Sequence, residues 1–313
     1  MKILKTHKVL LILGNGFDLS LGLKTSYKNF MESEIFKKRV HIKHYPNAER
    51  DLHDKNIHNY LAQQMGLGNW IDVEMELKKY AAAKRVEYHY DNGGYLSTQN
   101  ASDDYIKMSY SLLCLDLQNY INSLDYTALN EDALSLQLYK MIASHKRNEV
   151  VSFNYTDLAQ LKKKIKCNVE YIHGNIHLGI ILGFQRFNDM APGYEYMIKL
   201  ENPNYKSCHV YEKMCASDEI VIFGHSLGET DHCYFEPFFE EQTNKDAKTK
   251  FLTIFTLNAQ SKESIVRQMV SLSSGKYREF QDNTNVTIIE TENNEEEVRQ
   301  YILGLRKRMR RFW

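Results

Sequence analysis

The chain has 313 residues and no net charge, because 40 Lys and Arg are balanced by 40 Asp and Glu. This balance leaves no overall field to concentrate nucleic acid or an anionic membrane surface, so any charged partner must be met by a local site. The five cysteines are scattered and include no CxxC pair, which argues against a disulfide framework and a structural zinc. A reducing, cytoplasmic environment fits this cysteine usage best.

The N-terminal segment MKILKTHKVLLILG places lysines before a short apolar run. The run is followed by GNGFD and not by the small residues of a signal-peptide cleavage site. No stretch approaches the roughly 18 to 20 apolar residues of a membrane span. We therefore expect a soluble protein that is neither secreted nor inserted in a membrane.

Short apolar runs rich in β-branched residues recur along the chain and predict strands buried on both faces of a parallel sheet. They are 8–14, 149–154, 169–174, 177–184, 219–227, 250–258 and 285–290. Helical patterns fall at 26–40, 157–165, 232–242, 261–273 and 295–309. The alternation predicts an α/β fold with a mostly parallel, doubly wound sheet in three layers, which is Rossmann-like.

Residues 45–145 interrupt this alternation, since they contain helical periodicity and no convincing buried strand. We expect an α/β nucleotide-binding domain formed by 1–44 and 146–313, with a helical insertion over 45–145. The turn-rich segment 91–103 is expected to be a loop within the insertion. The chain is long enough for one such core with one insertion.

The first predicted strand is followed by a glycine turn and a helix, the arrangement of a phosphate-binding corner. Gly14 and Gly16 would let the backbone approach a phosphate closely. A dinucleotide fingerprint GxGxxG would need glycine at position 19, where this chain has Leu19, so an ordinary dehydrogenase site is disfavoured. The chain has no Walker GxxxxGK[ST] segment either.

A second glycine pattern fits better. Gly14-Asn15-Gly16 and then Gly22-Leu23 resemble the NAD-binding turn of sirtuins, in which GAG is followed by Gly-Ile-Pro at the same spacing. Later segments resemble sirtuin strand ends in the same order along the chain. These are Phe153-Asn154, Tyr171-Ile172-His173-Gly174, Gly224 to Ser226 in VIFGHSL, and Thr256-Leu257-Asn258.

The amino-acid sequences of several segments also resemble those of a narrower family, the AbiH-type bacteriophage abortive-infection proteins. The segments are GNGFDLSLGLKTSYKNF, NWIDVE, FNYTDL, IHG and IFGHSLGETD, which together span most of the chain. This resemblance implies a role in anti-phage defence but carries no chemistry. The sirtuin resemblance supplies the chemistry.

The sirtuin resemblance implies a sirtuin-like core with NAD as substrate or ligand. Asn154 would orient the nicotinamide ribose or a water, and His173 would act as general base or ribose-binding partner. Asp18, where sirtuins have Ser, could hydrogen-bond a ribose hydroxyl or the loop itself, and Ser226 and Asn258 would lie on the adenosine side. The expected nucleotide-binding residues are Gly14, Asn15, Gly16, Phe17, Asp18, Gly22, Gly224, His225, Ser226 and Asn258.

Two departures from the sirtuin pattern bear on the activity. Sirtuins have Asp two residues after the Asn that corresponds to Asn154, whereas this chain has Thr156. The zinc-binding cysteine pairs of the deacetylases are missing, because Cys208 and Cys215 have a poor spacing for that role. Protein deacetylation is therefore not expected, and NAD glycohydrolase activity is the leading hypothesis.

No metal site is expected. Asp72 and Glu74 of NWIDVE are either a lid acid over the pocket or helix-start charges, and the nearby histidines lack a ligand spacing such as HExxH. The expected partners are a nucleotide and a phage-derived trigger or protein partner that meets the helical insertion. Homo-oligomerisation is left open, and nucleic acid and membrane partners are not expected.

Three other functions stay open. The segment GHSLG, 224–228, matches the G-x-S-x-G nucleophile elbow of α/β-hydrolases with Ser226 as nucleophile. The only later histidine is His232, which lies too close in sequence to face Ser226 across a pocket. A non-catalytic nucleotide sensor is the second alternative, and an interaction protein that has lost its ligand is the third.

Overall fold

The computed structural model describes residues 7–40, 56–67, 72–91, 99–158, 168–188, 190, 192–206 and 208–310. The chain divides into two compact units. The first unit comprises Met1–Leu23, Asp125–Ile172 and Lys206–Trp313, and the second comprises Lys24–Leu124 and His173–Tyr205. These boundaries differ from the expected insertion over 45–145, since the second unit starts earlier in the chain and includes a later segment.

The first unit is built on a six-stranded parallel sheet in the order β3-β2-β1-β6-β7-β8. Its strands are β1 (Val9–Leu13), β2 (Glu149–Ser152), β3 (Val169–Tyr171), β6 (Glu219–Phe223), β7 (Lys250–Thr256) and β8 (Thr284–Glu290). In chain order the sheet therefore reads 3-2-1-4-5-6, the order of the Rossmann fold. The predicted α/β fold class is confirmed.

The positions of the strands in the sheet follow from their sequences. The two central strands β1 and β6 are buried at every position, as expected for strands covered on both faces. They pair in register from Val9 opposite Glu219 to Leu13 opposite Phe223. The edge strand β8 instead has exposed and half-exposed residues along most of its length.

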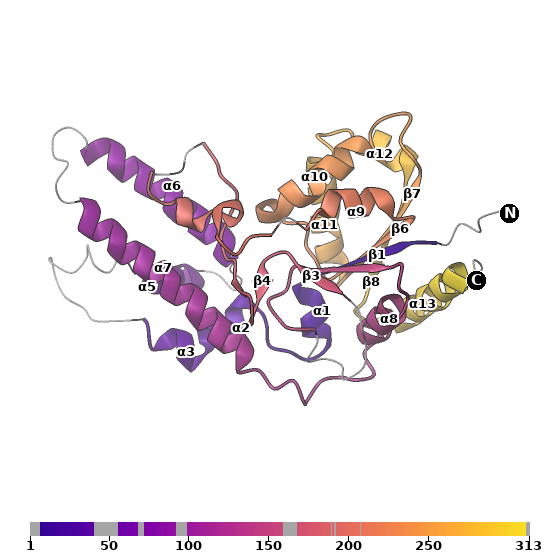
Figure 1. The fold of residues 1–313 in the computed structure, drawn as a ribbon, viewed down its shortest axis with the longest axis horizontal. Coiled ribbons are helices and arrows are strands. Elements are labelled where there is room, and N and C mark those ends of the chain that lie inside the picture. Colours follow the sequence, from indigo (N-terminus) through magenta and orange to yellow (C-terminus); the bar gives the residue numbers. More distant parts are fainter. Residues whose placement is uncertain are drawn as a thin grey trace. The chain divides into compact units, whose positions relative to one another are not determined.

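Helices cover both faces of this sheet (Figure 1). The helices of the first unit are α1 (Asn15–Ser20), α8 (Leu134–Ala143), α9 (Val210–Ala216), α10 (His232–Glu241), α11 (Ala259–Leu272), α12 (Tyr277–Asn283) and α13 (Glu295–Arg310), with a short 3-10 helix η3 at Glu229–Asp231. The C-terminal helix α13 packs against α8 on one face, and α10 packs against α9 and α11 on the other.

The second unit is mainly helical. Its elements are α2 (Tyr27–Glu32), α3 (Glu34–Lys37), α5 (Ile57–Leu67), α6 (Val73–Asp91), α7 (Gln99–Asn122), η1 (Glu195–Met197), η2 (Lys199–Glu201) and the two-stranded pair β4 (Gly174–Asn175) and β5 (Gly179–Ile180). Helix α7 buries one face at the spacing of an amphipathic helix, through Ile106, Tyr110, Leu113, Leu117, Tyr120 and Ile121.

Several predicted elements differ from the structure. The expected strand over 177–184 is wrong: only β5 forms there, and it pairs antiparallel with β4 outside the six-stranded sheet. Two glycines interrupt it, because Gly179 and Gly183 have φ of +88° and +147°. A Cβ at Gly183 would also lie 2.0 Å from the Met197 carbonyl oxygen.

The predicted helix over 26–40 forms as two shorter helices. Ser33 ends α2 and caps α3, because its side chain accepts a hydrogen bond from the Phe36 N–H. The expected loop over 91–103 is wrong at its C-terminal end, where residues 99–103 belong to α7. The helix expected over 157–165 falls mostly outside the described residues.

No helix in the described part of the chain combines the length and the apolar character needed to cross a membrane.

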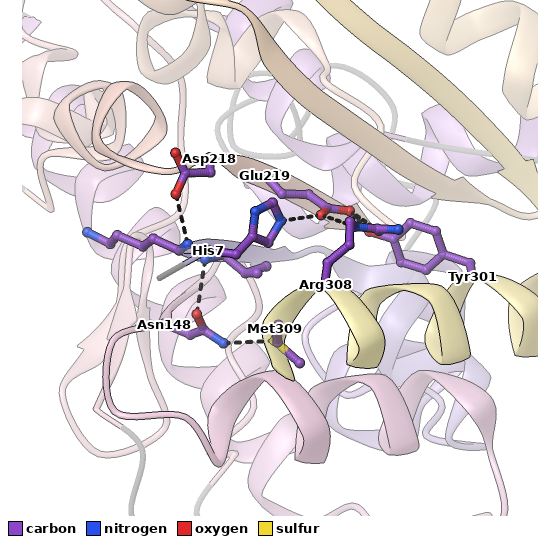
Figure 2. Close-up of polar contacts among 9 residues, drawn as sticks. His7, Asn148, Asp218, Glu219, Tyr301, Arg308 and Met309 are labelled. Atoms are coloured by element: carbon purple, nitrogen blue, oxygen red, sulfur yellow. Dashed lines mark hydrogen bonds and ion pairs between the residues drawn. The ribbon is translucent and has the colours of Figure 1, made fainter. Parts of the chain in front are cut away.

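A buried polar cluster joins the amino ends of the central strands to α13 (Figure 2). Glu219, at the start of β6, accepts hydrogen bonds from the Tyr301 hydroxyl at 2.7 Å and from the Arg308 guanidinium at 2.6 and 2.9 Å. His7 Nε2 lies 2.6 Å from the same carboxylate. Burial alone would raise the pKa of Glu219, but the hydrogen bonds from His7, Arg308 and Tyr301 hold it below its ordinary value.

The cluster continues to β1 and β2. Asn148 accepts a hydrogen bond from the Val9 N–H at 3.0 Å and donates to the Ile142 carbonyl and the Met309 sulfur (Figure 2). Lys8 donates its N–H to Asp218 at 3.0 Å. The amino edge of the sheet is therefore fixed by side chains from distant parts of the sequence, on the edge opposite to the predicted ligand site.

We expect Glu219→Gln to lower the free energy of unfolding at pH 7 by about 1.5–3 kcal/mol, the usual contribution of hydrogen bonds to a charged group. Because the folded-state pKa is lowered, this stabilisation is complete above the ordinary value of 4.5 and is lost as the pH falls through the folded-state pKa. Urea unfolding at a series of pH values measures both effects.

The matched control is Glu263→Gln, because Glu263 is 74% exposed and meets only Arg267 one turn away. Its change should stay within about 0.5 kcal/mol. Equal effects of the two substitutions at pH 7 would contradict the role given to Glu219.

Candidate functional site

The strand order has one reversal point, which lies between β1 and β6. The strands β2 and β3 follow β1 on one side, and β6, β7 and β8 extend from its other side. Open α/β sheets bind ligands outside the carboxyl ends of their strands at such a point. Gly14, Asn154 and Gly224 directly follow or lie near the ends of β1, β2 and β6, so the sheet brings these predicted site residues to one edge.

The glycines at this edge let two turns pack backbone against backbone. Gly14 donates its N–H to the Phe223 oxygen at 3.0 Å, and Gly16 donates to the Gly224 oxygen at 2.9 Å. A Cβ on Gly16 would lie 2.7 Å from Gly224 Cα, and one on Gly14 would lie 2.5 Å from His225 Cα. Gly224 also has φ of +67°, which favours glycine. Side chains at these positions would push the turns apart.

This packing changes what the glycine turn offers a ligand. The N–H groups of Gly14, Gly16 and Phe17 donate to backbone oxygens of the protein, so these three groups are already engaged. The Phe17 ring is fully buried and packs edge-on against Tyr139 and Phe223, which anchors α1 to the sheet. Asn15 is exposed at the tip of the turn. Gly22, with φ of +88°, ends the turn that follows α1.

Asn154 ties the end of β2 to the glycine turn. Its side-chain Nδ2 donates to the Gly14 carbonyl oxygen at 3.0 Å, and its own N–H donates to the Ser152 hydroxyl at 3.2 Å. The side chain is only 5% exposed. The predicted catalytic asparagine is therefore held rigidly against the β1 turn.

Asp18 lies beside Asn154 in the same buried environment. The Thr156 hydroxyl donates to Asp18 Oδ2 at 2.9 Å, which links α1 to the segment after β2. Burial raises the pKa of Asp18 from 3.8 to about 7, and the hydrogen bond from Thr156 and the nearby Asn154 amide, which favour the charged form, offset only part of this effect. A buried carboxyl group that titrates near neutral pH is a recognised mark of a functional site.

The loop after β6 is organised by His225. The Leu227 N–H donates to His225 Nδ1 at 3.0 Å, so the ring carries its proton on Nε2, which lies 3.2 Å from Asp231 Oδ2. The ring also packs on Phe153, with centroids 4.3 Å apart. Through the contact between His225 and Asp231, the two ends of the loop over 225–231 are held together.

The serine-hydrolase alternative does not fit this loop. Ser226 is exposed, and the backbone of Leu227, not of Ser226, has the positive φ that a nucleophile elbow requires. The chain continues through η3 before α10 begins, so no tight strand-to-helix turn presents the serine. His232 contacts the Leu227 oxygen and Gln268 at 3.1 and 2.8 Å.

The remaining predicted residues take separate positions. Asn258 caps α11, because its Oδ1 accepts from the Ser261 N–H at 3.1 Å. His173 is buried and belongs to the second unit, where its carbonyl oxygen accepts from the Ile181 N–H at 2.8 Å. The structure thus brings Gly14, Gly16, Asp18, Asn154 and Gly224 together within the first unit and places His173 in the other.

The NWIDVE acids have structural contacts within the second unit. Asp72 accepts from the N–H groups of Glu74 and Met75 at 3.0 and 3.1 Å, which caps α6. Glu74 forms a buried ion pair with Lys199 Nζ at 2.7 Å. The helix-start role is confirmed for Asp72, and Glu74 joins α6 to η2. No group of three metal-ligating side chains was found among the described residues.

Two residues of the site were not predicted as such from the sequence. Thr156 was noted only as a departure from the sirtuin pattern, and Asp231 was not singled out. Both occur in quoted segments, FNYTDL and GHSLGETD, in which a polar residue shortly follows a strand end. That position is the available signal, because the carboxyl ends of parallel strands share one edge of a sheet.

Strand order, the reversal point and the polar strand ends define a Rossmann-like α/β protein with a candidate ligand-binding edge. Comparison with family models then gives the identification. Residues 10–253 match the family described as Bacteriophage abortive infection AbiH, and the chain belongs to this family. Membership indicates a role in abortive-infection defence against phage. No curated protein matches the sequence.

We expect Gly16→Ala to lower the free energy of unfolding by about 1–3 kcal/mol, because its Cβ would meet the Gly224 backbone and force the two turns apart. Chemical unfolding measures the change. Gly66→Ala is the control, since a Cβ there meets nothing within 4 Å, and it should be neutral or stabilising by up to about 1 kcal/mol. If both variants behaved alike, the close approach of the turns would not be needed for stability.

We expect a fluorophosphonate probe to leave Ser226 unlabelled, because no contact of the loop activates its hydroxyl as a nucleophile. Intact-mass spectrometry of the treated protein and of Ser226→Ala measures this. Labelling that disappears in the variant would instead support the hydrolase alternative.

Proposed function

We propose that this AbiH-family protein binds NAD or a related nucleotide at the carboxyl edge of its sheet and cleaves the nicotinamide–ribose bond during phage defence. One observation carries the proposal. Asn154 is buried at the carboxyl end of β2, is fixed to the Gly14 carbonyl at the end of β1, and has a titratable carboxyl group, Asp18, beside it. Fixed polar groups next to a perturbed carboxyl are typical of catalytic sites.

The chemistry matches what these groups can supply. Hydrolysis of a glycosidic bond passes through an oxocarbenium-like state, and water must approach the anomeric carbon from a defined direction. An amide held in place by a hydrogen bond can orient that water or a ribose hydroxyl without moving itself. We assign Asn154 this role. His173 belongs to the second unit, and its role as general base or ribose-binding partner stays a prediction from the sequence.

The pair Asp18 and Thr156 supports the sirtuin-like interpretation. At the positions that correspond to 18 and 156, sirtuins have Ser and Asp, whereas this chain has Asp18 and Thr156. The two side chains are hydrogen-bonded at 2.9 Å. The carboxyl and the hydroxyl groups are thus exchanged between the two positions, and in this chain they meet, so that a carboxyl group still lies beside Asn154.

The other predicted residues have narrower roles in this proposal. Gly14, Gly16 and Gly224 shape the edge by close packing, with their contacts made to the protein. Asn15 and Ser226 are exposed and are the side chains of the two turns that we assign to ligand contact. A phage-derived trigger or a protein partner would act through the helical second unit.

We expect Asn154→Ala to reduce nicotinamide release from NAD by at least about 100-fold, the usual cost of losing a positioning group at the reacting centre. Chromatography of the products after incubation of the full chain with NAD measures this. The incubation is repeated with extract from phage-infected cells, which supplies a trigger. Asn119→Ala, at an exposed position on α7, is the matched control and should keep full activity.

Cellular NAD tests the same proposal without knowledge of the trigger. Infected bacteria that express the wild-type chain should lose NAD, and those that express Asn154→Ala should keep it. If NAD stabilises the purified protein against heat but neither assay detects cleavage, the non-catalytic sensor is the correct function. If no nucleotide raises the melting temperature, the edge has no nucleotide ligand.

A further inference from the structure

Asp18 has a contact pattern that the proposed function does not explain. Its side chain is 1% exposed and its Oδ2 accepts from Thr156, but Oδ1 is buried without a hydrogen-bond partner. An unpaired buried carboxyl oxygen is costly, and such atoms are rare in folded proteins. The Thr156 contact alone would be served as well by an uncharged side chain.

Asn154 offers an unused donor in the surroundings of Asp18. A side-chain amide has two hydrogens on Nδ2, and one of them is given to the Gly14 carbonyl oxygen at 3.0 Å. The Asn154 amide is also close enough to Asp18 to favour its charged form. The second amide hydrogen and the unpaired Oδ1 therefore lie in the same buried space.

We propose that Asp18 is a positioning residue that, once ionised, takes the second amide hydrogen of Asn154 and fixes the orientation of the amide. With both hydrogens engaged, the carbonyl oxygen Oδ1 is the only amide atom left for a ligand, and it can only accept. The group bound there must then be a hydrogen-bond donor, namely water or a ribose hydroxyl. This inference rests on the proposed function for the identity of the ligand but not for the contact itself.

The surroundings of Asp18 place this ionisation near neutral pH. Burial raises its pKa to about 7. Among the described residues, Asp18 and Asp157 both act electrostatically on the hydroxyl of Tyr126. Tyr126 stays neutral, because burial and then the two carboxylates raise its pKa, and Asp157 accepts a hydrogen bond from the Tyr171 hydroxyl at 3.2 Å. The two side chains that favour ionised Asp18, Thr156 and Asn154, are therefore neutral hydrogen-bond donors.

The buried carboxyl group of Asp18 makes the stability of the folded protein depend on pH. Because the folded-state pKa of Asp18 lies above its ordinary value of 3.8, the folded protein loses stability as the pH rises from that value to about 7. An amide at position 18 does not ionise. Asp18→Asn should therefore raise the melting temperature at pH 8 relative to the wild type, with a smaller difference at pH 5.

The decisive experiment follows the Asn154 side chain by NMR in the full chain with ¹⁵N-labelled asparagine. The Asn154→Ala spectrum identifies its NH₂ signals. In the wild type these signals should shift with pH with a midpoint near 7, and in Asp18→Asn the shift should vanish. Thr156→Val removes the donor that favours the charged form, so its midpoint should move to higher pH. Asp157→Asn, the matched control, should retain the titration.

Signals that do not titrate between pH 5 and 9 in the wild type, or that still titrate in Asp18→Asn, would overturn the positioning role. The wild-type and Thr156→Val titrations decide the question even if Asp18→Asn does not fold. If nicotinamide release is detected, its rate in the wild type should rise with pH with the same midpoint. This rise should be absent in Asp18→Asn. If no release is detected but the signals titrate, the proposed cleavage fails while the Asp18 to Asn154 contact stands.

Discussion

The close approach of two turns, at the ends of the central strands β1 and β6, is the constraint on which the rest of the candidate site depends. Gly16 and Gly224 meet backbone to backbone, and neither tolerates a Cβ in the present geometry. This contact sets the height of α1 above the sheet. Asn154, after β2, reaches the Gly14 carbonyl, and Thr156, two residues later, reaches Asp18 on α1, because α1 starts so close to the strand ends.

In the candidate site, a buried titratable group lowers the stability of the fold and apolar packing raises it. The buried carboxyl of Asp18 costs stability, whereas the neighbouring Phe17 and Phe223 rings and the apolar strands supply it. Functional sites commonly hold such unfavourable groups within a rigid frame. The cluster around Glu219 at the amino edge differs in kind, because there each acid oxygen has a donor and the pKa is lowered.

Much of the fold follows from local sequence patterns. Apolar runs such as VLLIL and EIVIF predict buried strands, and their alternation with helical segments predicts the doubly wound sheet. The strand expected over 177–184 failed because two glycines with positive φ interrupt an otherwise suitable apolar run. The structure divides the chain near Leu23, a position that no helix, strand or turn pattern of the sequence sets apart.

The candidate site was predictable in position but not in its contacts. Polar residues at strand ends identify the edge, because parallel strands all run in the same direction and end at the same edge of the sheet. The roles of the glycines depend on a partner more than 200 residues away, and the Asp18 to Thr156 bond joins residues 138 apart. Local pattern carries no information about such pairs. The capping contact of Asn258 is local, and its predicted ligand contact stays a prediction.

The cluster at the amino edge has a practical consequence for experiments on this protein. The Glu219 carboxylate contacts both His7 and Arg308, so positions near both ends of the described chain lie at the amino edge of the sheet, away from Asn154. A fluorophore or an immobilisation linker at the exposed Lys307 would therefore lie away from the carboxyl edge that carries Asn154. Surface-attached and labelled forms should be usable for ligand measurements without redesign.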